Sequence, residues 1–201
     1  MLFRSQEPPY YRAPFGGDAA NITIVENAGN EKVYYEFHQD GSQRKCLVIP
    51  DGAFRNPMTV EQIQNQIVRM PLTGVVMDGS TVFNFAQKEV PILVDSLTKM
   101  AETTKEDIDW FLFHQPNKFM LQKLAERIGV PFEKMPMDIV EKFGNSNSAT
   151  IPTAITADLK EEMLNKESLC CLAGFGAGVA WAGIIMKMGN MDFCDTIISD
   201  L

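Results

Sequence analysis

The spacing of apolar and polar residues changes several times along the chain, and each spacing predicts a type of element. Alternation with β-branched residues predicts three short strands, at Asn21–Glu26, Lys32–Phe37 and Cys46–Ile49. Apolar residues three and four positions apart predict helices at Thr59–Met70, from Met77–Ser80 through Leu97, after Asn117 to Ile128, and at Ser148–Asn165. Pro91 lies inside the second of these helices, where it predicts a kink or a break into two helices.

Continuous apolar runs mark the expected centre of the fold. The stretch DWFLFHQPN (Asp109–Asn117) predicts a buried strand that runs into a loop. Leu169–Ala173 and Val179–Met188 predict two more strands that are covered on both faces. Because strands and helices alternate here, we expect an α/β fold, a mixed sheet with parallel pairs that is covered by helices. Residues 1–14 are polar and contain three prolines, and we expect an irregular N-terminal arm before one domain at residues 15–201.

Composition narrows the classes of function. The 201 residues carry a net charge of −8, which argues against a nucleic-acid partner, since phosphate binding needs a basic surface. No apolar run approaches the roughly 20 residues that a membrane-spanning helix requires, and the N-terminus has no continuous apolar segment typical of a secretory signal. We therefore expect a cytoplasmic protein. The four cysteines lack CxxC spacing and are expected to be small core residues, Cys46, Cys170, Cys171 and Cys194.

Three polar or glycine-rich segments adjoin the predicted strands. His114 stands where a buried strand ends, the edge at which open α/β sheets bind ligands; it could equally be a partly buried histidine bonded to the backbone. Asn145 lies in GNSN ahead of a helix, where turn formation alone would also explain it. Gly176, Ala177 and Gly178 separate two strands, and such small residues let a backbone N–H approach a ligand and stabilise a developing oxyanion.

The motifs HQPN, GNSNSATIP and GFGAGVAWAG, in this order, resemble the C-terminal half of β-ketoacyl-ACP synthase III of the thiolase superfamily. FGGDAANITIVE resembles the segment that opens that half, and MDGSTVFNFA resembles its segment along the pantetheine tunnel. The resemblance covers residues 15–187 and implies a thiolase-like half with ketoacyl synthase III activity. That activity joins an acyl thioester to malonyl-ACP by decarboxylative Claisen condensation in fatty acid biosynthesis.

The resemblance also implies roles for individual residues. His114 and Asn145 correspond to the family's histidine and asparagine, whose nitrogens can donate to the thioester oxygen as decarboxylation makes it an enolate. The oxyanion turn of the acyl-enzyme falls on Ala177. The pantetheine arm of coenzyme A or of acyl carrier protein, which are substrates rather than cofactors, falls beside Gly79, Phe83, Ala86 and Asn117. No metal is implied.

The sequence departs from the family pattern in three ways. The family's nucleophilic cysteine lies in an N-terminal half, and none of the four cysteines here follows its pattern. Glu126 interrupts the basic face of the helix after HQPN, which weakens the case for acyl carrier protein as donor. Thr59–Met70 is similar to an inserted helix. The chain could therefore work with a cysteine-bearing N-terminal half, bind acyl thioesters as a non-catalytic subunit that supports an active partner, or be a structural module. Alone, we expect it to form a homodimer.

Overall fold

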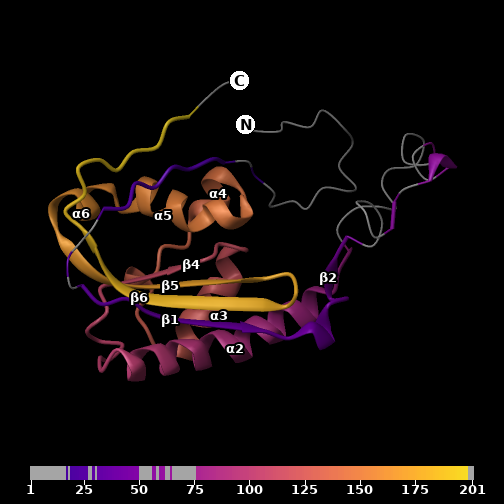
Figure 1. Cartoon of the computed structure of the whole chain (residues 1–201), viewed down its shortest axis with the longest axis horizontal. Helices are drawn as coiled ribbons and strands as arrows, with labels where there is room; N and C mark the ends of the chain where they lie inside the picture. Colours follow the sequence, from indigo (N-terminus) through magenta and orange to yellow (C-terminus); the bar gives the residue numbers. More distant parts are fainter. Residues whose placement is uncertain are drawn as a thin grey trace.

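The structure is a computed structural model that describes residues 17, 19–26, 29, 31–49, 56–57, 59–61, 64 and 76–198 (Figure 1). Its centre is a four-stranded sheet with the order β1-β6-β5-β4. The strands are β1 (Tyr34–Gln39), β4 (Trp110–Phe113), β5 (Glu167–Gly176) and β6 (Ala180–Gly189). Strands β4 and β5 are parallel, whereas β5 with β6 and β6 with β1 are antiparallel. The predicted mixed sheet is therefore confirmed.

Helices cover the sheet on both faces (Figure 1). Helices α2 (Gly79–Met100) and α3 (Lys118–Ile128) lie on one face, which we call the α2 face. Helices α4 (Ile139–Phe143), α5 (Thr150–Asp158) and α6 (Lys160–Asn165) lie on the other, the α5 face. Single turns of 3-10 helix occur at η1 (Gly41–Gln43), η2 (Phe132–Lys134) and η3 (Asn147–Ala149), and a small two-stranded sheet joins β2 (Leu47–Val48) to β3 (Val76–Met77).

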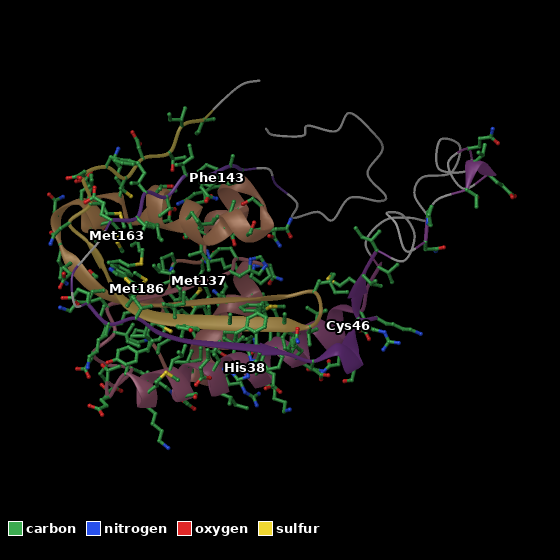
Figure 2. The ribbon with its side chains drawn as sticks, in the orientation of Figure 1. His38, Cys46, Met137, Phe143, Met163 and Met186 are labelled. Atoms are coloured by element: carbon green, nitrogen blue, oxygen red, sulfur yellow. The ribbon has the colours of Figure 1, made fainter. Side chains whose placement is uncertain are left out.

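The two faces have separate cores because strand side chains alternate between them. The main core packs α2 and α3 against inward residues such as Phe111, Phe113 and Ile185. A smaller core packs α5 and α6 against Leu112 and Cys170. Figure 2 shows labelled side chains on both sides of the sheet, with Met163 in the α6 layer and His38 near α2.

Two predicted helices differ from the structure in their boundaries. Helix α2 continues through Pro91 as one helix of 22 residues, so the predicted break into two helices is wrong, while the alternative of a kink stays a prediction. Pro91 is buried among neighbours that anchor both halves of α2, and this packing compensates for the backbone hydrogen bond that a proline cannot donate. The helix predicted at Ser148–Asn165 is instead divided at Leu159, whose φ of −122° is not helical, into α5 and α6.

The strand predicted at Asn21–Glu26 is also wrong, because these residues pair with no described strand. Its apolar residues are open to solvent, with Ile22 87% and Val25 85% exposed. An alternating pattern becomes a strand only where a partner supplies the ladder of hydrogen bonds. Most of the helix predicted at Thr59–Met70 lies outside the described residues, as does the arm at residues 1–14. No helix in the described part of the chain is long and apolar enough to cross a membrane.

Candidate functional site

His114 follows directly after β4 and is held by its own backbone. Its N–H donates to the Ala173 carbonyl at 2.8 Å, which extends the parallel pairing of β4 with β5 by one residue. Alternation along β4 then directs the ring toward the α5 face, where Nδ1 lies 2.8 Å from Oγ1 of Thr150. The ring also makes an edge-to-face contact with Phe175, at 5.6 Å between centroids. Two contacts therefore fix the orientation of the imidazole.

Burial controls the charge of this imidazole. Desolvation lowers the pKa of His114 below its ordinary value near 6.5, and a hydrogen bond to the backbone of Asn147 opposes that shift without cancelling it. The side chain is therefore mostly neutral at neutral pH. A neutral imidazole has one N–H and one lone pair, so the identity of the protonated nitrogen decides what it can do.

Asn145 lies in the loop between α4 and η3 with a defined carboxamide orientation. The N–H of Asn147 donates to Asn145 Oδ1 at 2.9 Å, which leaves Nδ2 as the end of the amide available to donate. The N–H of Gly17 donates to the Asn145 carbonyl at 3.0 Å. A side chain at Gly17 would meet the Phe143 carbonyl, since a Cβ built there lies 2.0 Å from that oxygen. The loop is therefore held from both sides.

Hydrogen bonds on either side of the Asn147 backbone link these two candidate residues. The His114 ring contacts Thr150 Oγ1, which donates to the Asn147 carbonyl at 2.8 Å, and the Asn147 N–H bonds the Asn145 side chain. Asn147 has a positive φ of 54°, a conformation that asparagine tolerates better than most residues. Two residues from separate segments thus belong to one polar network at one edge of the sheet.

The glycine-rich turn connects β5 directly to β6. Ala177 is exposed, and Gly178 has a φ of 141° that favours glycine. The next residue, Val179, exchanges two backbone hydrogen bonds with Asp40, which ties the turn to the end of β1. Phe175, immediately before Gly176, is the aromatic ring that His114 contacts. The turn and the polar network therefore adjoin the same end of β5.

The residues expected beside a pantetheine arm lie in the first eight residues of α2 and at the N-cap of α3. Gly79 is the first residue of α2 and is exposed, whereas Ala86 is fully buried in the main core. The Phe83 ring stacks on Phe119 of α3 at 5.9 Å between centroids. Asn117 caps α3, with Oδ1 accepting from the Met120 N–H at 2.8 Å. Gly79, Phe83 and Asn117 can thus line a surface, while Ala86 supports it from below.

None of the four cysteines, all of which lie in the described chain, resembles an activated thiol. All four are buried. Burial raises the pKa of the Cys170 and Cys171 thiols to about 12, far above that of a reactive thiolate. Cys171 pairs with Phe111, three residues before His114, which places it roughly 10 Å away along the strand direction. A thiol at that position cannot share a reacting atom with the imidazole.

Sequence reasoning missed Thr150, Asn147 and Gly17 as members of the site. Thr150 is the first residue of α5 and has no solvent exposure, so its hydroxyl lies inside the network. A hydroxyl residue shortly after a glycine-asparagine turn, at the start of a predicted helix, is the signal that could have identified it. Gly17 offered no comparable signal, because its role depends on a contact with a segment more than 100 residues away.

Residues 98–188 match the family described as 3-oxoacyl-[acyl-carrier-protein (ACP)] synthase III C terminal. The chain is 31% identical over 173 residues to β-ketoacyl-[acyl-carrier-protein] synthase III of Synechocystis sp., covering 86% of this chain and 51% of that protein. The protein of the same name from Natranaerobius thermophilus is 30% identical over 174 residues, again covering 86% and 51%.

Solved structures agree with these relatives. A 3-oxoacyl-(acyl-carrier protein) synthase from Burkholderia xenovorans superposes with a TM-score of 0.75 and 33% identity, over 86% of this chain and 49% of that one. The predicted thiolase-like half is thereby confirmed. The chain spans about half the length of the curated relatives it matches. The chain is therefore β-ketoacyl-[acyl-carrier-protein] synthase III-like, and its similarity is to the C-terminal half of these proteins.

Proposed function

We propose that this chain is the C-terminal half of a 3-oxoacyl-[acyl-carrier-protein] synthase III-like acyltransferase. The reaction is the decarboxylative Claisen condensation of an acyl thioester with malonyl-ACP in fatty acid biosynthesis, in the cytoplasm. The observation that carries the proposal is the chain of hydrogen bonds from His114 through Thr150 and Asn147 to Asn145. A network of this kind holds an imidazole and a carboxamide in a fixed relation, as a site that must stabilise a developing charge requires.

Asn145 and His114 act on the malonyl thioester in this proposal. Loss of carbon dioxide leaves an electron pair that becomes an enolate, with negative charge on the thioester oxygen. Asn145 Nδ2 is available to donate to this oxygen because Oδ1 is already bonded to Asn147. The backbone N–H of Ala177 is assigned to the second oxyanion, which forms when the acyl group is transferred. Coenzyme A or acyl carrier protein would present its pantetheine arm along Gly79, Phe83 and Asn117.

The nucleophile comes from a second, cysteine-bearing half in this proposal, because the four cysteines of the chain are buried. The α5 face supports such a partner. Tyr35 and Phe37 alternate away from α2, and they are 70% and 67% exposed on the sheet's open side. Ile22 and Val25 add further exposed apolar surface in the N-terminal part of the chain. A partner half that covers Tyr35 and Phe37 would remove this apolar area from water.

Coenzyme A is favoured over acyl carrier protein as the acyl donor. Acidic carrier proteins need free basic residues on the docking helix, yet Lys118 lies 2.6 Å from Asp138 and Lys123 lies 2.7 Å from Glu126. These ion pairs neutralise much of the positive field of α3. Exposed ion pairs of this kind contribute little to the stability of the fold. Their main effect is to weaken the electrostatic attraction of α3 for an acidic partner.

A second function is a non-catalytic subunit that binds acyl thioesters or supports an active partner. The observation in its favour is that no thiol in the chain is accessible and activated. The two functions differ in one respect: only the first requires His114 and Asn145 for turnover.

Reconstitution separates these two functions. The chain would be co-expressed with the N-terminal half of the Synechocystis relative, and the purified complex supplied with acyl-coenzyme A and malonyl thioester. We expect condensed product that disappears with His114→Ala and persists with His38→Ala, a matched control on the opposite face of the sheet. A complex that forms but turns over equally well with His114→Ala would support the non-catalytic function.

A further inference from the structure

The most constrained hydroxyl in the site belongs to Thr150, which sequence reasoning did not select. We propose that Thr150 is a positioning residue that holds neutral His114 in the tautomer protonated at Nδ1, so that Nε2 carries the lone pair. This tautomer would decide whether Nε2 of His114 accepts or donates a proton in the proposed reaction. The catalytic role of the tautomer rests on the proposed function, but the tautomer itself does not.

Three polar groups surround Thr150 Oγ1. His114 Nδ1 lies 2.8 Å away, the Gln115 N–H donates to it at 3.2 Å, and the Asn147 carbonyl lies at 2.8 Å. The side chain has no solvent exposure, so no bulk water replaces any of these partners. A buried polar group that lacks a hydrogen bond is costly, and all three contacts therefore constrain where the protons are.

Counting donors assigns the protons. A threonine hydroxyl has one hydrogen and two lone pairs. The Asn147 carbonyl can only accept, so the single hydroxyl hydrogen lies between Oγ1 and that carbonyl. The Gln115 N–H can only donate, and it takes one lone pair of Oγ1. The remaining contact needs a hydrogen from His114, which places a proton on Nδ1.

The opposite tautomer would leave one of these contacts without a hydrogen. If the hydroxyl donated to Nδ1, Oγ1 and the Asn147 carbonyl oxygen would stand 2.8 Å apart with no proton between them. Two oxygen lone pairs at that distance repel each other. The same carbonyl accepts the Thr150 backbone N–H, and its hydrogen bond with the imidazole raises the pKa of His114, so this oxygen accepts from every group that faces it.

The consequence concerns the direction of proton transfer. Because burial keeps the ring mostly neutral, Nε2 of His114 is an acceptor that takes a proton from an S–H, O–H or N–H group brought to it. Nε2 donates only after the ring has become an imidazolium. Of the two residues assigned to the enolate oxygen, Asn145 is then the one that donates while the ring is neutral, through Nδ2.

The tautomer can be measured on the chain itself, without any activity. The sequence contains only two histidines, so long-range ¹H–¹⁵N correlation spectra of ¹⁵N-labelled protein resolve both rings, and His38→Gln assigns them. Spectra would be recorded at about pH 8, above the ordinary histidine pKa, so that neutral rings dominate. The variants are Thr150→Val, Thr150→Ser and Thr153→Val. Thr153 is the matched control, a buried threonine of the same helix whose hydroxyl donates to the Ala149 carbonyl at 2.8 Å.

We expect the wild type, Thr150→Ser and Thr153→Val to show His114 protonated at Nδ1, with the nitrogen shift of Nε2 in the unprotonated range. Thr150→Val should move the ring toward the Nε2–H form, which is the usual preference of neutral histidine in water. A wild-type chain whose His114 is protonated at Nε2 overturns the proposal. So does a Thr150→Val chain that folds and keeps the Nδ1–H form. Neither result depends on whether a reconstituted complex catalyses condensation.

Discussion

The two faces of the sheet differ in how completely they are closed. On the α2 face, the 22-residue helix α2 and helix α3 cover a core whose central residues, among them Leu97 and Phe113, have no solvent exposure. On the α5 face, three shorter helices cover a smaller core, and Tyr35 and Phe37 remain open at the β1 edge. The site residues His114 and Asn145 belong to this less complete face, through their link to Thr150 of α5.

This difference is what the proposed function requires, in which one face stabilises the chain and the other binds a partner half. The closed face needs nothing further to exclude water. The open face has both the exposed apolar residues that a partner would cover and the polar network that a nucleophile would complete. The following predictions test this division, from the largest expected effect to the smallest.

The isolated chain should not condense acyl and malonyl thioesters. Removing one member of a catalytic unit typically costs on the order of 10⁴–10⁶ in rate, and the proposed function assigns the nucleophile to a second half. Mass spectrometry of product formed by the pure chain is the measurement. Turnover that disappears when one of the four cysteines is changed would show that a buried cysteine is the nucleophile after all.

Stability should respond very differently to changes on the two faces. Leu97→Ala removes a fully buried side chain of the α2 face, and it should lower the free energy of unfolding by about 2–5 kcal/mol. Tyr35→Ser, at a 70% exposed position on the open side, should change it by less than about 0.5 kcal/mol. Urea unfolding of both variants and of the wild type measures the two changes in the free energy of unfolding. A loss of similar size for Tyr35→Ser would mean that the open face is already closed in the isolated chain.

Association should depend on the open face. Without a partner half, a second copy can cover Tyr35 and Phe37 through a two-fold contact, so the chain should self-associate. Phe37→Lys should weaken this association by about tenfold or more, which is about 1.4 kcal/mol. Light scattering behind size exclusion across a concentration series measures it, with the exposed Ile92→Lys on α2 as the control. A monomer of 22.5 kDa at every concentration argues against this use of the face.

The smallest effect is a pH dependence of stability that originates in His114. A histidine whose pKa is lowered by folding binds fewer protons in the folded state, so stability falls as the pH drops below the ordinary pKa of about 6.5. The urea midpoint should therefore be lower at about pH 5.5 than at about pH 7.5, and His114→Gln should reduce that difference. An unchanged difference in the variant would assign the pH dependence to other groups.

The sequence predicted the strands and the helix around the candidate site better than it predicted the N-terminal strand and the boundaries of the other helices. The strand ending at His114, the helix capped by Asn117 and the paired strands around Gly176–Gly178 all follow from local apolar spacing and turn residues. The strand at Asn21–Glu26 could not be judged locally, because a strand depends on a partner elsewhere. The helices show a similar limit. Helix α2 continues through Pro91, whereas a division occurs at Leu159, and local spacing determined neither outcome.

The candidate site shows a related limit. His114 and Asn145 stood out because their residue types and positions carry chemistry. Thr150 did not, since its importance comes from three neighbours in two separate segments that only the folded chain brings together. A sequence motif identifies residues that contact a substrate more readily than it identifies residues that position those side chains.

One measurement tests most directly the proposal that this chain stabilises the enolate while a cysteine-bearing half supplies the nucleophile. A reconstituted complex in which the partner's nucleophilic cysteine is replaced by alanine would be assayed for carbon dioxide release from malonyl thioester. The account predicts that decarboxylation continues without condensed product, and that Asn145→Ala in this chain then lowers it on the order of 10²–10³-fold, the usual effect of removing an oxyanion donor. Asn165→Ala, at the exposed end of α6, should leave it unchanged. Carbon dioxide release that is indifferent to Asn145→Ala would contradict the account.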